Sequence, residues 1–296
     1  MGPRLPMVQS MDPEAPAVRR PAAPRISSRS PASLRIARSL ERRGYRQLPD
    51  ALLGLARRSG RLERVVEHEL PGGLRVEVPL WQAPIDARDL QAHRDGVVRV
   101  LARRIDRLGL PTAVVDVGAG IGLVPALLGA ASPHVCEVVA IEQDPEQCRF
   151  LARNLAALAR TRQIEARPVG VAAGAVAAQG IDAMGLAGGG CLVVRMDVDG
   201  AEDEVIEGAL ATLTAVEHAI IAFTVRVAGI ERLGSDPSRV VAGLGSVGAV
   251  AATVVERPGV VLDPARPFLD QVRGEAAYTV VCELAPSAGV EGRHAA

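Results

Sequence analysis

The residues of this chain that could do chemistry begin with a glycine-rich stretch. Thr112 to Gly122 reads T-A-V-V-D-V-G-A-G-I-G, an apolar run that ends at Asp116 and is followed by Gly118, Gly120 and Gly122. The glycines let the backbone turn sharply and approach a ligand closely, since no Cβ stands in the way. A buried strand, a glycine turn and a following helix are typical of the nucleotide-facing end of a doubly wound α/β fold.

The spacing of the glycines limits this interpretation. It is G-x-G-x-G, whereas the dinucleotide fingerprint G-x-G-x-x-G requires glycine at the position of Leu123. A strand–helix turn of any α/β protein therefore stays open as an alternative on this stretch alone.

A second candidate is the acid that ends the next apolar run. Cys136 to Glu142 reads C-E-V-V-A-I-E, and Glu142 follows Gly118 by 24 residues. An acid about 20 residues after the turn, at the end of the second strand, accepts the ribose hydroxyls in such folds. The alternative is a strand-end carboxylate that caps the next helix, which begins at Asp144-Pro145. We assign the capping role to Asp144 and the ribose role to Glu142.

A third apolar run delivers carboxylates to the same edge of the expected sheet. Cys191 to Leu213 begins C-L-V-V-R-M-D-V-D-G, so Asp197, Asp199 and Gly200 follow a strand. The acids at 202–204 fit the first turn of a helix, where the macrodipole stabilises them. Asp197 is not explained in this way, and we predict a base or cation-binding role for it. Asp197 and Asp199 permit Mg²⁺ without demanding it, and we predict no metal site.

Three segments together resemble the FkbM-type S-adenosylmethionine-dependent methyltransferases. They are V-V-D-V-G-A-G-I-G, V-V-A-I-E-Q-D-P-E-Q-C-R-F-L-A-R-N-L and V-R-M-D-V-D-G-A-E-D-E-V-I-E-G-A, in that order within residues 112–225. The resemblance implies a seven-stranded, Rossmann-like class I methyltransferase sheet with S-adenosylmethionine as cofactor. It also implies that Glu142 binds the ribose and that four residues surround the methionine moiety: Asp116, Gly118, Gly120 and Gly122.

The chain departs from the family on the acceptor side. The family's K-I-D-V-E-G is R-M-D-V-D-G here, and the strand at 218–225, H-A-I-I-A-F-T-V, lacks the acid that members usually carry. Asp197 is our first candidate for a catalytic base or for orienting the acceptor. Asp199 and His93 are the others, and Asp197 is also expected beside the cofactor.

The remaining pattern divides the chain around this core. Residues 1–30 are rich in Pro, Arg, Ala and Ser without periodicity, and we expect a disordered basic arm. Residues 31–110 predict a helical and β-hairpin cap, with a hairpin over 67–80 and an amphipathic helix over 89–108. Residues 111–285 form the expected methyltransferase domain, closed by two antiparallel β-segments, and 286–296 a frayed tail.

Composition restricts the classes of function. The 48% hydrophobic content excludes wholesale disorder. The sequence contains no run of 18 apolar residues, so we expect no membrane span. Residues 1–64 carry 14 Arg and five acids, a net charge of +9, but aromatic residues for base stacking are nearly absent, so we expect no nucleic-acid partner. Four scattered cysteines, Cys136, Cys148, Cys191 and Cys282, predict small buried side chains in a reducing, cytoplasmic setting.

Three functional hypotheses follow. The first is an O-methyltransferase that uses S-adenosylmethionine and a hydroxyl of a small-molecule secondary metabolite or sugar-containing acceptor. A sulfonium methyl needs only a nucleophile held in line at about 3–3.5 Å, so positioning dominates this chemistry. The second is a catalytically degenerate domain that serves as a binding partner, and the third is a nicotinamide-dependent oxidoreductase.

Overall fold

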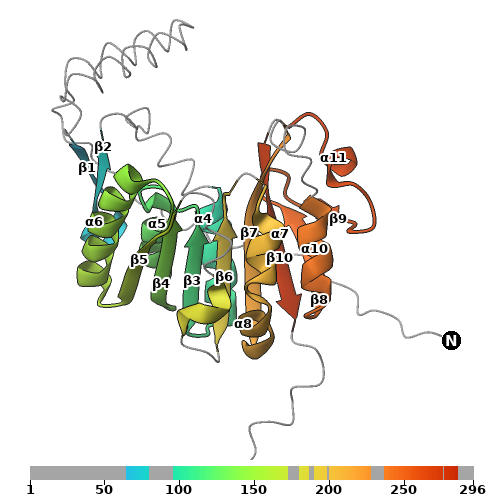
Figure 1. Ribbon diagram of the computed structural model, residues 1–296, viewed down its shortest axis with the longest axis horizontal. Helices are drawn as coiled ribbons and strands as arrows, with labels where there is room; N and C mark the ends of the chain where they lie inside the picture. Colours follow the sequence, from blue (N-terminus) through green and yellow to red (C-terminus); the bar gives the residue numbers. More distant parts are fainter. Residues whose placement is uncertain are drawn as a thin grey trace, which may run out of the picture.

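The computed structural model describes residues 65–79, 96–172, 180–186, 190–198, 200–227, 237–275 and 277–285. Its centre is an eight-stranded sheet with the order β5-β4-β3-β6-β7-β10-β8-β9 (Figure 1). The strands are β3 (Thr112–Val117), β4 (Val135–Glu142), β5 (Glu165–Gly170), β6 (Cys191–Met196), β7 (His218–Arg226), β8 (Ala249–Val254), β9 (Val261–Leu262) and β10 (Ala277–Ala285).

The sheet is doubly wound. From β3 the chain adds β4 and β5 on one side, and then returns to add β6 and β7 on the other, all in parallel. Strand β10 lies antiparallel between β7 and β8. The predicted fold class and the antiparallel closing pair are confirmed. The predicted number of seven strands is wrong by one, because the two-residue β9 adds to the edge beside β8.

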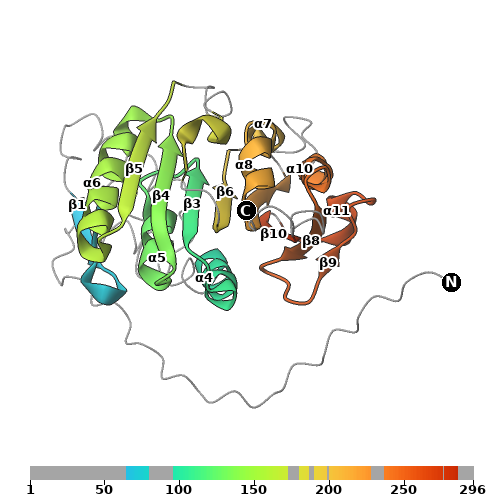
Figure 2. The ribbon, with the colours of Figure 1, turned by 90° about the horizontal axis from the view of Figure 1, so that it is seen from below.

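Helices cover both faces of the sheet (Figure 2). One face carries α4, α5 and α6, and the other carries α7, α8, α10 and α11, as the two separate clusters of buried side chains also show. Their bounds are α4 (Val97–Leu108), α5 (Leu123–Ala131), α6 (Pro145–Arg162), α7 (Glu202–Glu207), α8 (Leu210–Ala215), α10 (Pro237–Gly245) and α11 (Phe268–Gln271), with short 3₁₀ turns η2 (Pro71–Gly73) and η5 (Ile181–Met184).

The burial of the central strand β3 on both faces explains why its sequence is apolar. All six residues of β3 are buried, since both faces of a parallel sheet are covered by helices. Its side chains alternate between the two cores: Val114 packs with the α4–α6 side and Val115 with the α7–α11 side.

Capping residues mark the end of α4 and the start of α6. Gly109 adopts the left-handed conformation after α4 and donates its N–H to the carbonyl of Ile105. Asp144 caps α6 by accepting a hydrogen bond from the N–H of Glu146, which confirms its predicted role. The described part of the helix predicted over 89–108 begins at Val97. The segments 1–64, 80–95 and 286–296, with their predicted arm, helices and tail, lie outside the described residues.

The predicted hairpin is present as β1 (Val65–Glu69) and β2 (Arg75–Pro79), joined by η2. It packs on α6 through Asn154, which is 1% exposed. The Asn154 side chain accepts from the N–H of Glu77 at 2.7 Å and donates to the Glu77 carbonyl at 3.0 Å. It also donates to the carbonyl of Ile121 at 2.8 Å. One amide therefore ties the hairpin to the glycine turn that follows β3.

Two of the four cysteines correct a prediction. Cys191 and Cys282 are buried, as expected of small apolar side chains, and burial raises their pKa values to about 11 and about 12. Cys136, however, is exposed, because its side chain leaves β4 near the start of the strand, and Cys148 is half-buried on α6. Within the described residues, no helix has the length and apolarity required to cross a membrane.

The Asn154 clamp gives a stability prediction. Asn154→Ala leaves the Glu77 N–H and the carbonyls of Glu77 and Ile121 without this partner, and we expect a loss of about 2–4 kcal/mol in the free energy of unfolding. Chemical denaturation measures it. The control is Arg153→Ala, which removes an exposed ion pair to the same Glu77 and is expected to cost about 0–1 kcal/mol. Equal costs for the two variants would contradict the clamp.

Candidate functional site

The site lies where the direction of strand addition reverses. Strand β3 is flanked by β4 and β6. From β4 the chain continues to β5 toward one edge of the sheet, and from β6 it continues to β7 toward the other edge. In open α/β sheets, ligands bind at the carboxyl ends of the strands at such a switch point. The glycine turn follows β3 there, and the segment around Asp197 follows β6.

The backbone of the turn explains its glycines. Gly118, Gly120 and Gly122 all have positive φ angles, of 75°, 58° and 80°. Space is also restricted: a Cβ on Gly118 would overlap the carbonyl oxygen of Asp197, and one on Gly122 would lie 2.7 Å from a methyl carbon of Leu151. The turn therefore packs directly against the segment after β6 and against α6.

Glu142 lies at the end of β4, beside this turn. Its Oε2 accepts the N–H of Gly120 at 2.7 Å, and its Oε1 accepts the N–H groups of Gln143 and Asp144, each at 2.8 Å. The residue is only 6% exposed. Three backbone donors thus fix a buried carboxylate at the switch point, where the sequence predicts an acid that binds ribose.

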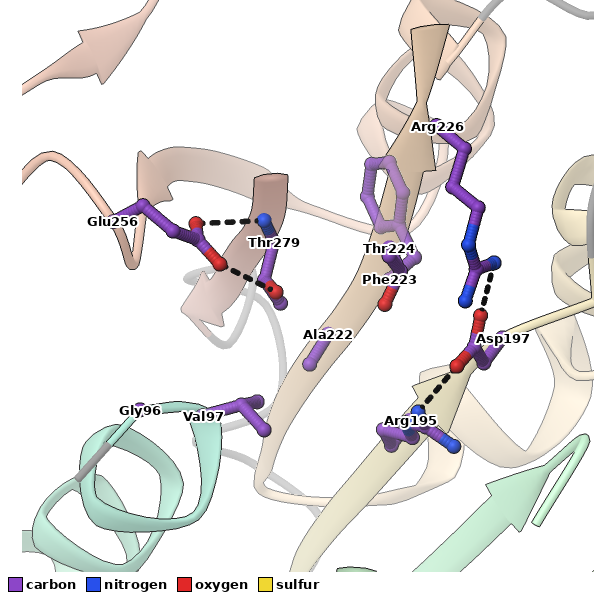
Figure 3. A pocket seen from close by; sticks show the side chains of 10 residues that line it. All are labelled: Gly96, Val97, Arg195, Asp197, Ala222, Phe223, Thr224, Arg226, Glu256 and Thr279. Atoms are coloured by element: carbon purple, nitrogen blue, oxygen red, sulfur yellow. Dashed lines mark hydrogen bonds and ion pairs between the residues drawn. The ribbon is translucent and has the colours of Figure 1, made fainter. Parts of the chain in front are cut away.

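Arg195 is the centre of a chain of charges at the ends of β3, β6 and β7, of which Figure 3 shows Arg195, Asp197 and Arg226. Its guanidinium contacts Asp116 Oδ1 at 3.0 Å and Asp197 Oδ2 at 2.7 Å, and donates to the Gly118 carbonyl at 3.3 Å. The other Asp197 oxygen forms an ion pair with Arg226 at 2.5 Å. The charges therefore alternate in the order Asp116, Arg195, Asp197, Arg226.

Burial and the neighbouring charges set the ionisation of Asp116 and Arg195. The side chain of Asp116 is 1% exposed, and burial raises the pKa of its carboxyl although Arg195 opposes the shift. Burial alone would lower the pKa of Arg195, but Asp116 and Asp197 outweigh it and raise that pKa. Arg195 therefore stays charged, and removing it would leave Asp116 without a compensating charge.

The alternation of β-strands brings these side chains to one face. Residues two apart in a strand point to the same side of the sheet. Four of the polar side chains each have a neighbour two positions away in the same strand that belongs to the core on the α4–α6 side. Those pairs are Val114 with Asp116, Val193 with Arg195, Ala222 with Thr224, and Val281 with Thr279. Register then places Asp116 opposite Arg195, and Thr224 opposite Thr279.

A pocket of about 280 Å³ opens on this face, at the start of α4 (Figure 3). Its size is near the lower end of the range of about 300–1,000 Å³ that is typical of small-molecule sites. Polar and charged side chains from β6, β7, β10 and the segment after β8 surround a small apolar wall. The lining residues are Gly96, Val97, Arg195, Asp197, Ala222, Phe223, Thr224, Arg226, Glu256 and Thr279.

The structure brings together most of the predicted site residues. Six of them lie at one edge of the sheet: Asp116, Gly118, Gly120, Gly122, Glu142 and Asp197. Asp199 and His93 lie outside the described residues. Both oxygens of Asp197 contact arginines, so the geometry favours an orienting role for it over that of a base. Among the residues that the structure describes, no group of three or more His, Cys, Asp or Glu could hold a metal ion.

The sequence did not predict five residues of the site: Asn154, Arg195, Arg226, Glu256 and Thr279. The only available signal was the alternation along β7 and β10, which puts polar Thr224, Arg226 and Thr279 on one face. The sequence does not show that β10 inserts beside β7, and so does not show that these side chains meet.

The close contact at Gly118 predicts a sharp effect of a methyl group. Gly118→Ala combines a positive φ with an overlap with the Asp197 backbone. We expect it to cost about 1–3 kcal/mol more than strain at a positive φ alone. Gly185→Ala is the matched control, because Gly185 also has a positive φ (61°) but nothing within 4 Å of an added Cβ. Denaturation of both variants measures the difference, and similar stabilities would contradict the contact.

The buried pair predicts a pH-dependent loss of stability. Arg195→Met should cost about 3–5 kcal/mol at neutral pH, since removing one partner leaves buried charge uncompensated. In this variant the pKa of folded Asp116 lies above its unfolded value, so unfolding releases a proton at intermediate pH. The folded pKa of Asp116 is already raised in the parent protein, so the deficit relative to the parent should grow as pH rises from the folded pKa of the parent to the higher folded pKa of the variant. Denaturation at several pH values measures this, and a pH-independent deficit would be inconsistent with Asp116 as the group left unpaired.

Comparisons with known proteins find similarity in solved structures only. No protein-family model matches the chain, and no curated protein matches it. The chain is similar to the precorrin-6y C5,15-methyltransferase of Geobacter metallireducens, with 17% identity over 63% of this chain and 87% of that one and a TM-score of 0.37. It is also similar to an SAM-dependent O-methyltransferase of Thermotoga maritima, with 14% identity over 64% and 65% of the two chains and a TM-score of 0.39.

A third similar structure contains a small molecule. It is the TYW2 protein of P. horikoshii in complex with MeSAdo, with 18% identity over 74% of this chain and 70% of that one and a TM-score of 0.41.

Proposed function

We propose that this protein is an S-adenosylmethionine-dependent methyltransferase that transfers the methyl group to a hydroxyl of a small-molecule secondary metabolite or sugar-containing acceptor. The observation that carries the proposal is the hydrogen bond between the N–H of Gly120 and Glu142 Oε2 at the switch point. It places a glycine turn and a buried acid side by side, as a nucleoside-binding site requires.

The side chains present fit such a cofactor. Glu142 uses three of the roughly four acceptor positions of a carboxylate, so a ribose hydroxyl can bind the remaining one or replace the Gly120 N–H. Asp116 Oδ2 is buried and has no hydrogen-bond partner among the residues that the structure describes, whereas buried polar atoms in proteins are normally paired. The ammonium group of the cofactor's methionine moiety would supply a donor for this oxygen.

The chemistry asks little of the protein beyond positioning. When bound, the cofactor would supply an electrophilic methyl group and leave as S-adenosylhomocysteine, while the acceptor oxygen, held in line by the protein, would release its proton to water. The pocket adjoins the segment after β6 and is therefore next to the proposed cofactor site. Asp197, fixed by Arg195 and Arg226, orients polar groups at this boundary.

Two features disfavour a nicotinamide-dependent oxidoreductase. Leu123 stands where the dinucleotide fingerprint needs its third glycine, and it is a buried residue of the first turn of α5. Asp116, two residues before the first glycine, would also place a carboxylate close to the pyrophosphate. The negative charges of this carboxylate and of the pyrophosphate would repel each other.

One observation supports a second candidate. Strand β7 carries no acid on the acceptor side, which suits a degenerate methyltransferase-like domain that binds a partner. A methylated product formed only in the presence of S-adenosylmethionine would reject this candidate.

The cofactor proposal predicts micromolar binding of S-adenosylhomocysteine, measured by calorimetric titration. Glu142→Ala should abolish this binding, because it removes the ribose acceptor and three hydrogen bonds that shape the turn. Glu165→Ala, an exposed acid on β5 away from the switch point, should leave the affinity unchanged. NAD should give no heat.

The variants separate binding from folding. Glu142→Gln retains one acceptor oxygen and should show weakened but detectable binding in a protein that still unfolds cooperatively. An unchanged affinity in both Glu142 variants, or the absence of heat with the parent protein, would refute the proposal.

A further inference from the structure

Glu256 occupies a distinct place in the pocket. It follows β8, and its two oxygens accept hydrogen bonds from the N–H of Thr279 at 2.7 Å and from the Thr279 hydroxyl at 3.0 Å. These two bonds hold the carboxylate against β10 at the rim of the pocket (Figure 3). A carboxylate held in this way is preorganised for a ligand, since little side-chain freedom remains to be lost on binding.

Among the charged side chains that line the pocket, Glu256 is the carboxylate with which no arginine of the described residues pairs. The four-residue chain from Asp116 through Arg195 and Asp197 to Arg226 contains two negative and two positive charges, and so is neutral. Within the described residues, the hydrogen-bond donors to Glu256 are the N–H and the hydroxyl of Thr279, which are uncharged. Over the described ranges, Glu256 forms no ion pair.

The neighbouring cation is engaged elsewhere. The guanidinium of Arg257 contacts Glu275 at 3.2 Å and donates to the carbonyl of Arg273 at 2.5 Å. It is therefore directed away from Glu256, whose carboxylate stays at the rim without an ion pair to any described residue. A ligand with a single positive charge is the complement of this arrangement.

We propose that the pocket binds an acceptor that carries a protonated amine, and that Glu256 is the residue that binds this amine. The inference rests on the proposed function for the reaction, but the binding of the amine can be measured separately. The pocket volume of about 280 Å³ suits a small, polar molecule of the size of an amino sugar. The hydroxyl to be methylated then lies at the opposite end, near Asp197 and the cofactor site.

This arrangement also accounts for the missing acid of β7. Thr224 of β7 lies opposite Thr279 of β10 in the antiparallel register. Glu256, held on Thr279, therefore brings a carboxylate to the neighbourhood of the strand that lacks one. A protonated amine has no free lone pair, so an amine held by Glu256 would be protected from methylation while the hydroxyl reacts.

The probes are glucosamine, glucose and N-acetylglucosamine, titrated into the full chain in the presence of saturating S-adenosylhomocysteine at a pH at which the amine is protonated. We expect glucosamine to bind at least about tenfold more tightly than either neutral sugar, and to weaken as salt is added because the charge lies at an exposed rim. Equal binding of the three sugars, or no binding of glucosamine, would overturn the proposal.

Matched variants locate the effect. Glu256→Gln removes the charge but keeps an acceptor for Thr279, and should reduce glucosamine affinity about tenfold without changing the affinity for S-adenosylhomocysteine. Glu275→Gln removes a nearby carboxylate that pairs with Arg257 outside the pocket, and should change neither affinity. Glucosamine binding that survives Glu256→Gln would refute the assignment. If the parent protein did not bind S-adenosylhomocysteine, this result would instead refute the proposed function.

Discussion

The arrangement of the site depends on a buried arginine held between two carboxylates. Arg195 contacts Asp116 at the end of β3 and Asp197 after β6, and its side chain is only 11% exposed. A guanidinium has five donors in a fixed fork, so a single side chain can bind both acids and the Gly118 carbonyl at once. The spacing between the glycine turn and the segment after β6 is therefore fixed by charge as well as by packing.

The surrounding layers hold this centre from two directions. On one side, Asn154 of α6 donates hydrogen bonds to the Glu77 carbonyl of the hairpin and to the Ile121 carbonyl, so it links the hairpin to the glycine turn. On the other side, Arg226 extends the charge chain from Asp197 to the end of β7 and forms a wall of the pocket. Rigid secondary structure thus positions the polar groups, and the pocket lies between them at the start of α4.

Much of this centre could be predicted because its signals are local. The apolar run of β3, the glycine turn, the Asp144 cap and the strand-end position of Glu142 each follow from neighbouring residues. Arg195 could be placed on the same side of its strand as Asp197, but its pairing with Asp116 depends on the parallel register of β3 and β6. That register is a property of the folded sheet.

The parts that could not be predicted come from distant strands. Glu256 and Thr279 reach the pocket only because β10 inserts antiparallel between β7 and β8. The edge strand β9 has two residues, too few to give a periodic pattern. The exposure of Cys136 likewise depends on where β4 emerges from its neighbours, which the residue type does not indicate.

The most direct test of this account is a crystal structure of the protein with S-adenosylhomocysteine. We expect the ribose hydroxyls within hydrogen-bond distance of Glu142, about 2.6–3.2 Å, with the sulfur facing the pocket beside Asp197. Arg195 should still contact both Asp116 and Asp197. A ligand bound away from the glycine turn, or an Arg195 side chain released from its two carboxylates, would contradict the central claim.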